Sequence, residues 1–172
     1  FTVFCVVCSL AQNKNFDLAI DLFNQKQYVL AQSLFQEIDS DIALLYNAKC
    51  SKILLSDDSK ELFVKLINDF PYSNFCSDAN LDLADIYYNE KKYFSAIKYF
   101  NIANKKLNKS EYFKLAYSYF QVDSLVSAKH FFSKLLFIET EYQSASKYYF
   151  AHIAYKSKNY QTALKWFKQL EN

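Results

Sequence analysis

The 172-residue chain contains no glycine, no arginine and no methionine, and it has a single proline. Glycine-rich phosphate loops, dinucleotide-binding fingerprints and serine elbows flanked by glycines all need backbone conformations that only glycine adopts readily. The sequence therefore excludes enzymes and nucleotide-binding proteins that depend on these motifs. The absence of arginine also removes the side chain that makes bidentate contacts with phosphates and base edges.

Apolar and aromatic residues are abundant, at 52% and 19% of the chain. This composition and length fit one domain, or one run of repeats, with a sizeable core. Twenty lysines face eighteen acidic residues, for a net charge of +2, and no run of like charges exceeds two. Such a balanced, interspersed pattern predicts a folded protein rather than a disordered one, and no nucleic-acid partner.

The N-terminal segment from Phe1 to Ala11 has no charged residue and is followed by polar residues. Small residues at Ser9 and Ala11 fit the cleavage rule of secretory signal peptides, so we expect residues 1–11 to be the end of a signal peptide. Three alternatives are a membrane anchor, for which eleven residues are too short, a buried first helix, and a lipoprotein site at Cys8, which bulky Val7 disfavours.

Cysteines occur at four positions. Cys5 and Cys8 have a CxxC spacing, but they lie in the apolar N-terminal run without a second pair, so a metal or redox site is not expected. Cys50 and Cys76 could pair in an exported protein, whereas the favoured interpretation is two thiols that act as small apolar side chains.

Internal repetition is the main signal in this sequence. Four pairs of alanines share a spacing of twelve residues: Ala19 and Ala31, Ala84 and Ala96, Ala116 and Ala128, and Ala151 and Ala163. Four residues after each second alanine stands a phenylalanine, at Phe35, Phe100, Phe132 and Phe167. Three residues before each second alanine stands a large apolar residue, at Tyr28, Tyr93, Leu125 and Tyr160.

This spacing predicts pairs of amphipathic helices joined by short polar turns. A small residue in each helix lets the two backbones approach closely, and the phenylalanine one turn later lies on the same face. One such hairpin cannot bury its apolar face alone, so the units must stack. We predict helices over residues 15–25, 28–38, 41–55, 57–69, 75–90, 93–107, 109–121, 124–138, 142–157 and 160–171.

These units resemble tetratricopeptide repeats, best in the segment that contains Leu83, Ala84, Tyr87, Ala96 and Phe100. The resemblance covers residues 15–170, although the tryptophan and glycine of the family consensus are absent. It implies an all-α, right-handed superhelical solenoid of antiparallel hairpins. We expect about five hairpins over residues 12–172, continuing in a longer parent protein.

The second hairpin is irregular. Ala48 lies in its first helix, but Ser59 and Phe63 follow at a spacing one residue shorter than elsewhere, and Pro71 is expected to end its second helix. Ser40 or Asp41, Ser56 or Asp57, Ser110 and Ser124 are candidate N-caps. Without glycine, we expect Asn24, Asn89 and Asn159 to adopt the left-handed conformation at helix ends.

No set of residues indicates catalysis. His130 and His152 are the only histidines, they lie in different units, and neither has a metal-ligand spacing. Acidic pairs such as Asp82 and Asp85, or Asp17 and Asp21, are common on solvated helix faces and have no nucleophile beside them. We therefore expect no enzyme activity, cofactor or metal.

The family resemblance implies a binding groove on the concave face, formed by the first helix of each hairpin. Residues three before, one after and four after the small residue point into it: Leu81, Asp85, Tyr88, Phe113, Tyr117, Phe120, Tyr148, His152 and Tyr155. Aromatic side chains supply large contact area at low entropic cost. An alternative is that they pack between adjacent first helices. The lysine and asparagine of the family's carboxylate clamp are absent from these rows.

The sequence thus predicts a non-catalytic scaffold that binds a protein or peptide, in the periplasm or at an envelope membrane of a bacterium. One alternative is a subunit of an outer-membrane assembly machine. Another is the interaction domain of a longer enzyme or sensor, which would also account for membrane association.

Overall fold

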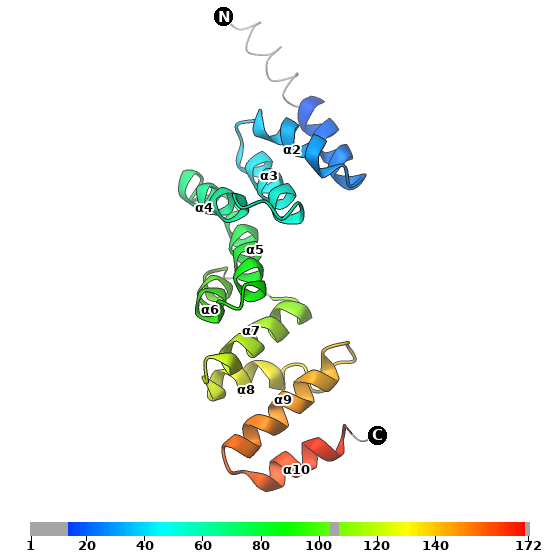
Figure 1. The fold of residues 1–172 in the computed structure, drawn as a ribbon, viewed down its shortest axis with the longest axis vertical. Coiled ribbons are helices and arrows are strands. Elements are labelled where there is room, and N and C mark those ends of the chain that lie inside the picture. Colours follow the sequence, from blue (N-terminus) through cyan, green and yellow to red (C-terminus); the bar gives the residue numbers. More distant parts are fainter. Residues whose placement is uncertain (1–13, 104–106, 171–172) are drawn as a thin grey trace, which may run out of the picture. The chain divides into compact units, whose positions relative to one another are not determined.

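The computed structural model describes residues 14–103 and 107–170, and this part of the chain is helical with no β-strand (Figure 1). The expected signal peptide lies outside the described residues, and so do Cys5 and Cys8. Residues 14–24 are helical. The following helices are α2 (Tyr28–Gln36), α3 (Asp41–Ile53), α4 (Ser59–Asp69), α5 (Cys76–Asn89), α6 (Tyr93–Ile102), α7 (Lys109–Gln121), α8 (Leu125–Ser133), α9 (Gln143–Lys156) and α10 (Tyr160–Lys168).

Sequence periodicity predicted each of these helices, and the differences lie at their ends. The second helix of a hairpin is shorter than expected: α8 ends at Ser133 rather than at residue 138. After Phe132 the backbone tightens, because the amide of Leu135 donates to the carbonyl of Phe132 three residues back. This turn allows both Leu135 and Leu136 to be buried.

The repeated alanines lie where the two helices of each hairpin meet. Seven of the eight have no exposed surface, and Ala163 has only 3%. The irregular second hairpin follows the same scheme, because Ser59 occupies the place of the second alanine and Phe63 is fully buried. The last hairpin differs: Trp166 is buried there, whereas the neighbouring Phe167 is only half-buried. Small residues at the contact therefore set the helix spacing throughout.

The chain divides within α5 into two compact units, Phe1–Leu83 and Ala84–Asn172. In the first unit, helix 14–24 and α2 pack with α3 around Ala19, Ala31, Phe35, Ala43 and Cys50. The rings of Phe35 and Tyr46 stack there at 5.3 Å. A polar contact joins α3 to the start of α4, because the Ser51 hydroxyl donates to Asp58 at 2.7 Å.

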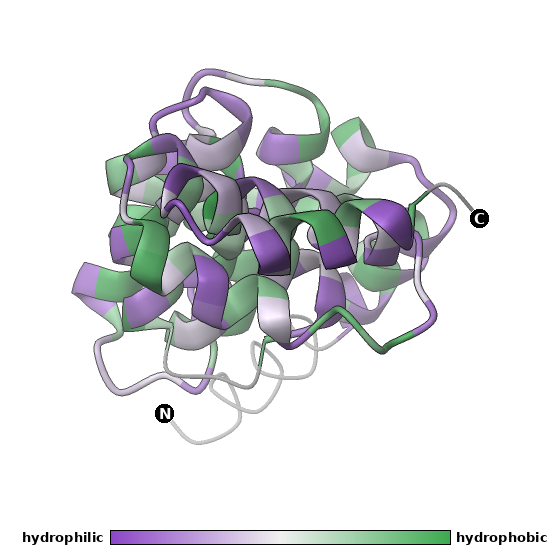
Figure 2. Cartoon of the chain, turned by 90° about the horizontal axis from the view of Figure 1, so that it is seen from below, coloured by the Kyte–Doolittle hydropathy of each residue, from purple (hydrophilic) through white to green (hydrophobic). Residues whose placement is uncertain are grey.

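In the second unit, α7, α8 and α9 surround a core of Ala116, Ala128, Phe132 and Ile153. A further cluster of Leu136, Ala151 and Trp166 joins α9 to α10. Hydrophobic and hydrophilic residues alternate along the helices (Figure 2), as expected where a helix buries one face and leaves another in water.

Both described cysteines are free thiols. Cys50 is fully buried, and burial raises the pKa of its thiol from 9.0 to about 11. The Cys76 thiol donates to the Phe70 carbonyl at 3.2 Å, just beyond the end of α4. Cys50 is therefore a buried small side chain, as the favoured interpretation predicts, whereas Cys76 is only half-buried and makes a hydrogen bond. No described helix is long and apolar enough to cross a membrane.

Helix N-caps agree with the sequence in part. Ser40 caps α3 as expected, accepting a hydrogen bond from the Ala43 amide at 3.2 Å. The prediction of Ser110 for α7 is wrong, because Asn108 and Glu111 form a capping box two residues earlier. Asn159 caps the start of α10 by accepting from the Thr162 amide. Ser124 precedes α8 but its side chain makes no capping bond.

Among the described residues, left-handed backbone occurs at Lys26, Leu55, Lys91, Asp123 and Lys158, with φ between 56° and 62°. The prediction of Asn24, Asn89 and Asn159 is therefore wrong. Each left-handed residue closes a hairpin turn, and the backbone bonds repeat: the Lys158 amide donates to Tyr155, and the Asn159 amide donates to Ala154. This is the Schellman motif, and its geometry fixes which residue is left-handed, whatever the side chain.

A left-handed residue with a Cβ atom carries a conformational cost that glycine avoids. We expect Lys158→Gly to raise the free energy of unfolding by about 0.5–1 kcal/mol, after allowing for the greater freedom of glycine in the unfolded chain. The measurement is urea unfolding followed by circular dichroism. Ser157→Gly is the matched control, because φ at Ser157 is −82°. Equal effects of the two substitutions would contradict the turn geometry.

Candidate partner-binding surface

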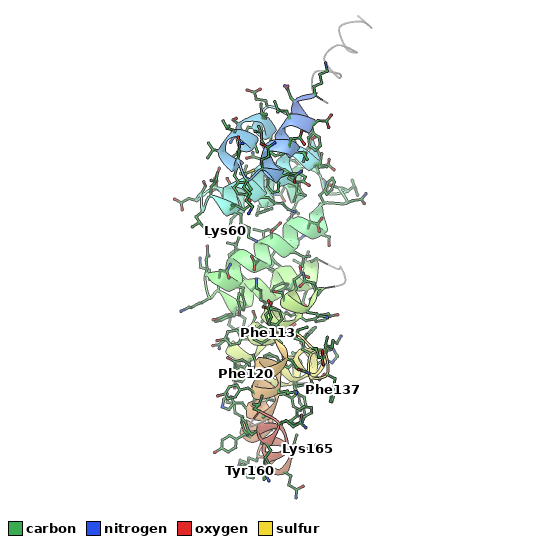
Figure 3. The ribbon with its side chains drawn as sticks, turned by 90° about the vertical axis from the view of Figure 1, so that its right-hand side faces the viewer. Lys60, Phe113, Phe120, Phe137, Tyr160 and Lys165 are labelled. Atoms are coloured by element: carbon green, nitrogen blue, oxygen red, sulfur yellow. The ribbon has the colours of Figure 1, made fainter. Side chains whose placement is uncertain are left out.

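Eight of the nine residues predicted for the groove belong to the second unit, and Leu81 belongs to the first. Leu81 is half-buried on α5. The other eight lie on α5, α7 and α9, the first helices of successive hairpins, and Figure 3 labels Phe113 and Phe120 among them. We call these eight residues, together with Tyr149, the first-helix surface.

The α7 part of this surface is an aromatic contact between adjacent first helices. The Phe113 ring stacks on Tyr142 at 5.1 Å, just before α9, and lies 6.3 Å from Tyr149 on α9. It also meets the buried Phe132 ring at 5.8 Å. Phe113 is half-buried, so it both packs against the core and contributes to the surface.

Tyr117 lies at the centre of a cluster of rings. Its ring is 6.0 Å from Tyr88, 5.9 Å from Tyr93, 6.3 Å from Phe113 and 5.3 Å from Tyr149. We call Tyr88, Tyr93, Tyr117 and Tyr149 the tyrosine cluster. Because it joins α5, α6, α7 and α9, Tyr117 packs between helices as well as facing the surface, and the alternative raised by the sequence holds for this residue.

The α9 part of the surface is more open. His152 lies between Phe120 at 5.5 Å and Tyr148 at 6.0 Å, nearly parallel to the Tyr148 ring. Its Nδ1 atom is buried without a hydrogen-bond partner among the described residues. Tyr148 is 47% exposed and Tyr155 is 57% exposed. Helical spacing places Tyr148, His152 and Tyr155 on one face of α9, so the exposed aromatic area is concentrated there.

Asp85 takes part in electrostatic contacts. Its carboxylate pairs with Lys114 of α7, and the Lys114 ammonium also lies 5.6 Å from the centre of the Tyr88 ring. In the first unit, Asp82 pairs with Lys52 at 2.9 Å. Each carboxylate is therefore paired with a lysine of another helix.

Sequence analysis did not predict the roles of Lys114 and Tyr149, two residues that contact a neighbouring first helix. Both lie two positions before the small residue of their first helix, where Asp82 lies in α5. In each case this residue contacts the preceding first helix: Asp82 reaches Lys52, Lys114 reaches Asp85, and Tyr149 reaches Phe120 at 5.1 Å. The repeat register alone could have identified this position, because its contact recurs.

Burial perturbs the tyrosine hydroxyls. It raises the pKa of Tyr88 from 10.0 to about 12, and the neighbouring Tyr117 adds to the effect. The pKa values of Tyr93 and Tyr149 are raised as well, first by burial and then by Tyr117. Tyr88, Tyr93 and Tyr149 are therefore held more firmly in their protonated form by the fold.

The histidines do not form a site together. His130 is exposed on α8 and its ring contacts the Phe131 ring at 5.1 Å, whereas His152 lies on the first-helix surface. Within residues 14–103 and 107–170, no group of three or more His, Cys, Asp or Glu side chains could hold a metal ion.

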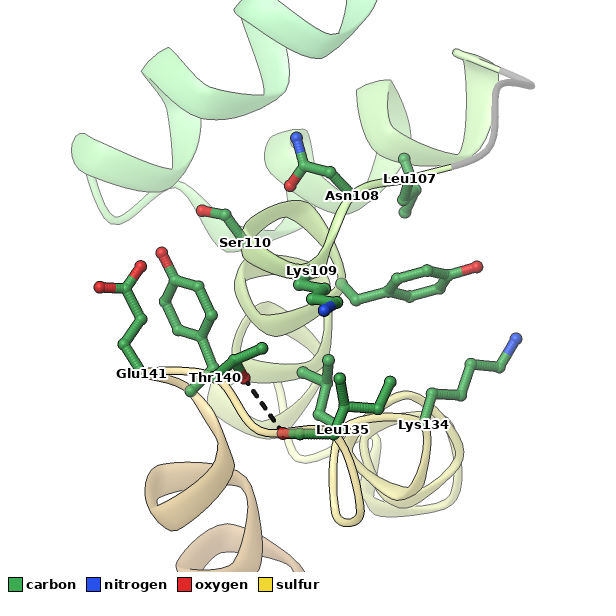
Figure 4. A pocket seen from close by; sticks show the side chains of 11 residues that line it. Leu107, Asn108, Lys109, Ser110, Lys134, Leu135, Thr140 and Glu141 are labelled. Carbon is green, nitrogen blue, oxygen red and sulfur yellow. Dashed lines mark hydrogen bonds between the residues drawn. The ribbon is translucent and has the colours of Figure 1, made fainter.

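Two cavities lie away from the predicted residues. A cavity of about 940 Å³ opens in the second unit between the start of α7 and the turn before α9 (Figure 4). Leu107, Tyr112, Leu135, Ile138 and Tyr142 supply its apolar lining, with Lys109, Lys134 and Glu141 beside them. A smaller cavity of about 450 Å³ lies between α2, α3 and α4 in the first unit. Sequence reasoning predicted neither cavity.

Comparisons with solved structures find the same helical arrangement. MamA from AMB-1 has a TM-score of 0.75 at 17% identity over 94% of this chain and 98% of that chain. MamA from MSR-1 has a TM-score of 0.71 at 18% identity over 94% and 95%. PilF from Pseudomonas aeruginosa has a TM-score of 0.64 at 17% identity over 95% and 76%. MamA and PilF are tetratricopeptide repeat proteins.

This chain has the tetratricopeptide repeat fold. No protein-family model matches it, and no curated protein matches its sequence. The similarity is therefore one of structure, and it agrees with the alanine register from which the fold was predicted.

Tyr117 and Tyr155 should respond differently to truncation. Tyr117→Ala removes a ring that contacts four others, so we expect it to lower the free energy of unfolding by about 2–3 kcal/mol. Tyr155→Ala removes an exposed ring that meets Tyr160 at 5.7 Å, and should cost less than about 0.5 kcal/mol. Urea unfolding measures both. Equal losses would contradict the assignment of Tyr117 to helix packing.

The tyrosine cluster predicts sensitivity to alkaline pH. The raised pKa of Tyr88, about 12, means that its hydroxyl ionises in the unfolded chain first. Stability is thus unaffected below about pH 10 and falls as pH rises from about 10 to 12. Unfolding midpoints across this range should fall less steeply for Tyr88→Phe than for the wild type. Tyr72→Phe is the control, because Tyr72 is 99% exposed. Identical profiles for all three proteins would disprove the prediction.

Proposed function

We propose that this protein is a non-catalytic scaffold that binds a segment of a partner protein on the first-helix surface of its second unit. The observation that carries the proposal is the exposed aromatic face of α9, which presents Tyr148 and Tyr155. Tyr148 contacts the more deeply packed Tyr149, which in turn contacts Phe120. Exposed aromatics supported by a rigid aromatic layer are typical of the residues that dominate binding energy. The repeat fold supports the same role.

The surface suggests the chemistry of the segment it would bind. Tyrosine rings offer apolar area, and their hydroxyls offer hydrogen bonds at the edge of that area. His152 adds a buried Nδ1 atom without a partner among the described residues. A segment with large apolar side chains and hydrogen-bonding groups between them suits this arrangement. A clamp for a terminal carboxylate does not, because Lys114 is already paired with Asp85.

The bacterial envelope is the location we propose, on the basis of the apolar run from Phe1 to Ala11. If that run is the end of a signal peptide, the mature protein begins at Gln12. N-terminal sequencing of the protein isolated from its native host tests this. Recovery of a chain that still carries Phe1 to Ala11 would contradict the proposed export.

A site-specific photocrosslinker tests the binding surface. Placed at Tyr155, it should capture a partner segment that mass spectrometry can identify. The same reagent at Ile138, which lines the large cavity and is 37% exposed, serves as the positional control. Crosslinking at Ile138 but not at Tyr155 would indicate that the partner binds at the cavity, and would overturn the proposal.

A synthetic peptide of the captured segment then allows affinity to be measured. Tyr155→Ala should weaken its binding by about 2 kcal/mol, roughly thirtyfold, while leaving stability almost unchanged. Tyr72→Ala is the control, because Tyr72 is a 99% exposed tyrosine of the first unit. Equal losses of affinity in the two variants would count against a first-helix site.

A further inference from the structure

The two units carry opposite charge. Residues 84–172 contain fourteen lysines and seven acidic residues, for a net charge of +7, whereas residues 1–83 contain six lysines and eleven acidic residues, for −5. The small net charge of the whole chain therefore conceals a strongly basic second unit. Such a field attracts anionic partners to one part of the molecule.

Within the second unit, the positive charge is least compensated on the second helices. α6, α8 and α10 contain no aspartate or glutamate, whereas they carry Lys98, Lys129, Lys165 and Lys168. The unit's acidic residues lie elsewhere and several are engaged: Asp85 pairs with Lys114, Glu90 pairs with Lys92, and Asp123 pairs with Lys156. The first helix α9 also contains no acidic residue, but its Lys156 is the partner of Asp123 and its Lys147 is half-buried. All four lysines of the second helices are exposed.

Exposed apolar residues accompany these lysines. Phe94 is 78% exposed on α6 and Val126 is 86% exposed on α8, and both lie two positions before the packed alanine of their helix. Two positions after that alanine lie Lys98 on α6 and Lys165 on α10. The two positions are four residues apart, about one helical turn, so they lie on the same face of a helix. Because they recur in successive hairpins of one unit, the apolar side chains and the lysines face the same way.

Six residues define what we call the second-helix surface: Phe94, Lys98, Val126, Lys129, Leu164 and Lys165. All six are exposed, and Leu164 at 56% adds an apolar side chain on α10 (Figure 3 labels its neighbour Lys165). Neither cavity includes any of them. The surface is therefore an open face that combines exposed apolar groups with uncompensated ammonium groups.

We propose that the second-helix surface binds the surface of an anionic phospholipid bilayer. Lysines near such a surface gain electrostatic energy from anionic headgroups, and exposed Phe, Val and Leu side chains can enter the boundary between headgroups and acyl chains. A bilayer of this kind therefore contacts the lysines and the exposed apolar side chains of the surface together. A nucleic acid would satisfy the lysines but leave Phe94 and Val126 in water, and the chain has no arginine for phosphate or base contacts.

Vesicle co-sedimentation of the purified chain tests this inference. The protein should bind vesicles of phosphatidylcholine and phosphatidylglycerol in equal parts, bind pure phosphatidylcholine vesicles much less, and dissociate in high salt. Lys98→Glu with Lys165→Glu should lower affinity for anionic vesicles about twenty-five-fold, because each lysine contributes about fivefold. Phe94→Ser with Val126→Ser should lower it about tenfold.

Matched controls come from the first unit. Val29→Ser changes the equivalent position of α2, where Val29 is 65% exposed, and Lys14→Glu with Lys65→Glu removes two exposed lysines. Both controls should bind vesicles like the wild type. Circular dichroism melting checks that every variant is folded. We expect them to fold, because α10 has the polar residue Gln161 at the position that Phe94 occupies in α6.

Several outcomes would overturn the proposal. One is equal binding to neutral and anionic vesicles, and another is unchanged binding of the second-unit variants. If the lysine variant loses binding while Phe94→Ser with Val126→Ser retains it, the contact is purely electrostatic and a nucleic acid or acidic protein fits better. Binding of the peptide captured at Tyr155 should be unaffected by these variants, so this inference and the proposed function can fail separately.

Discussion

Close contact between two helices at a pair of alanines is the interaction on which the rest of this structure depends. In each regular hairpin the two alanines are buried, which brings the backbones together and positions the large residues on either side. In the three regular hairpins before the last, the space around this contact is filled by the tyrosine or leucine that begins the second helix and by the phenylalanine one turn after its alanine. In the last hairpin Trp166 is the buried ring. Because one hairpin buries only part of its apolar surface, the next hairpin must pack against it.

Because the chain has no glycine and no methionine, other residues close its helical turns and fill its core. Each described hairpin turn places a non-glycine residue in the left-handed conformation, and paired backbone hydrogen bonds offset the strain. Aromatic rings do the filling that flexible methionine could do elsewhere. The tyrosine cluster around Tyr117 illustrates the result, because side chains expected to serve a binding groove also hold α5, α6, α7 and α9 together.

One position of the repeat shows how the surface changes along the chain. Two residues before the small residue of the first helix stand Asp82, Lys114 and Tyr149, and each contacts the preceding first helix. The contact is ionic in the first two cases and aromatic in the third. On α9 the exposed rings are those of Tyr148 and Tyr155, while the second helices of the same unit carry exposed lysines and no acidic residue. Two kinds of surface, with different partners proposed for each, can thus share one stack of hairpins.

The sequence by itself determined the hairpins, because a small residue at a fixed spacing with a phenylalanine one turn later has few other packing solutions. It located the helices, and it placed the eight second-unit residues of the predicted groove on successive first helices. Tertiary structure decided how deeply each lies: Tyr117 is enclosed by four rings and Tyr155 is mostly in water, although both occupy predicted groove positions. It also decided the left-handed residues and the large cavity. These depend on contacts between residues distant in the chain, or on hydrogen bonds of the closed turn, which no local pattern of side chains specifies.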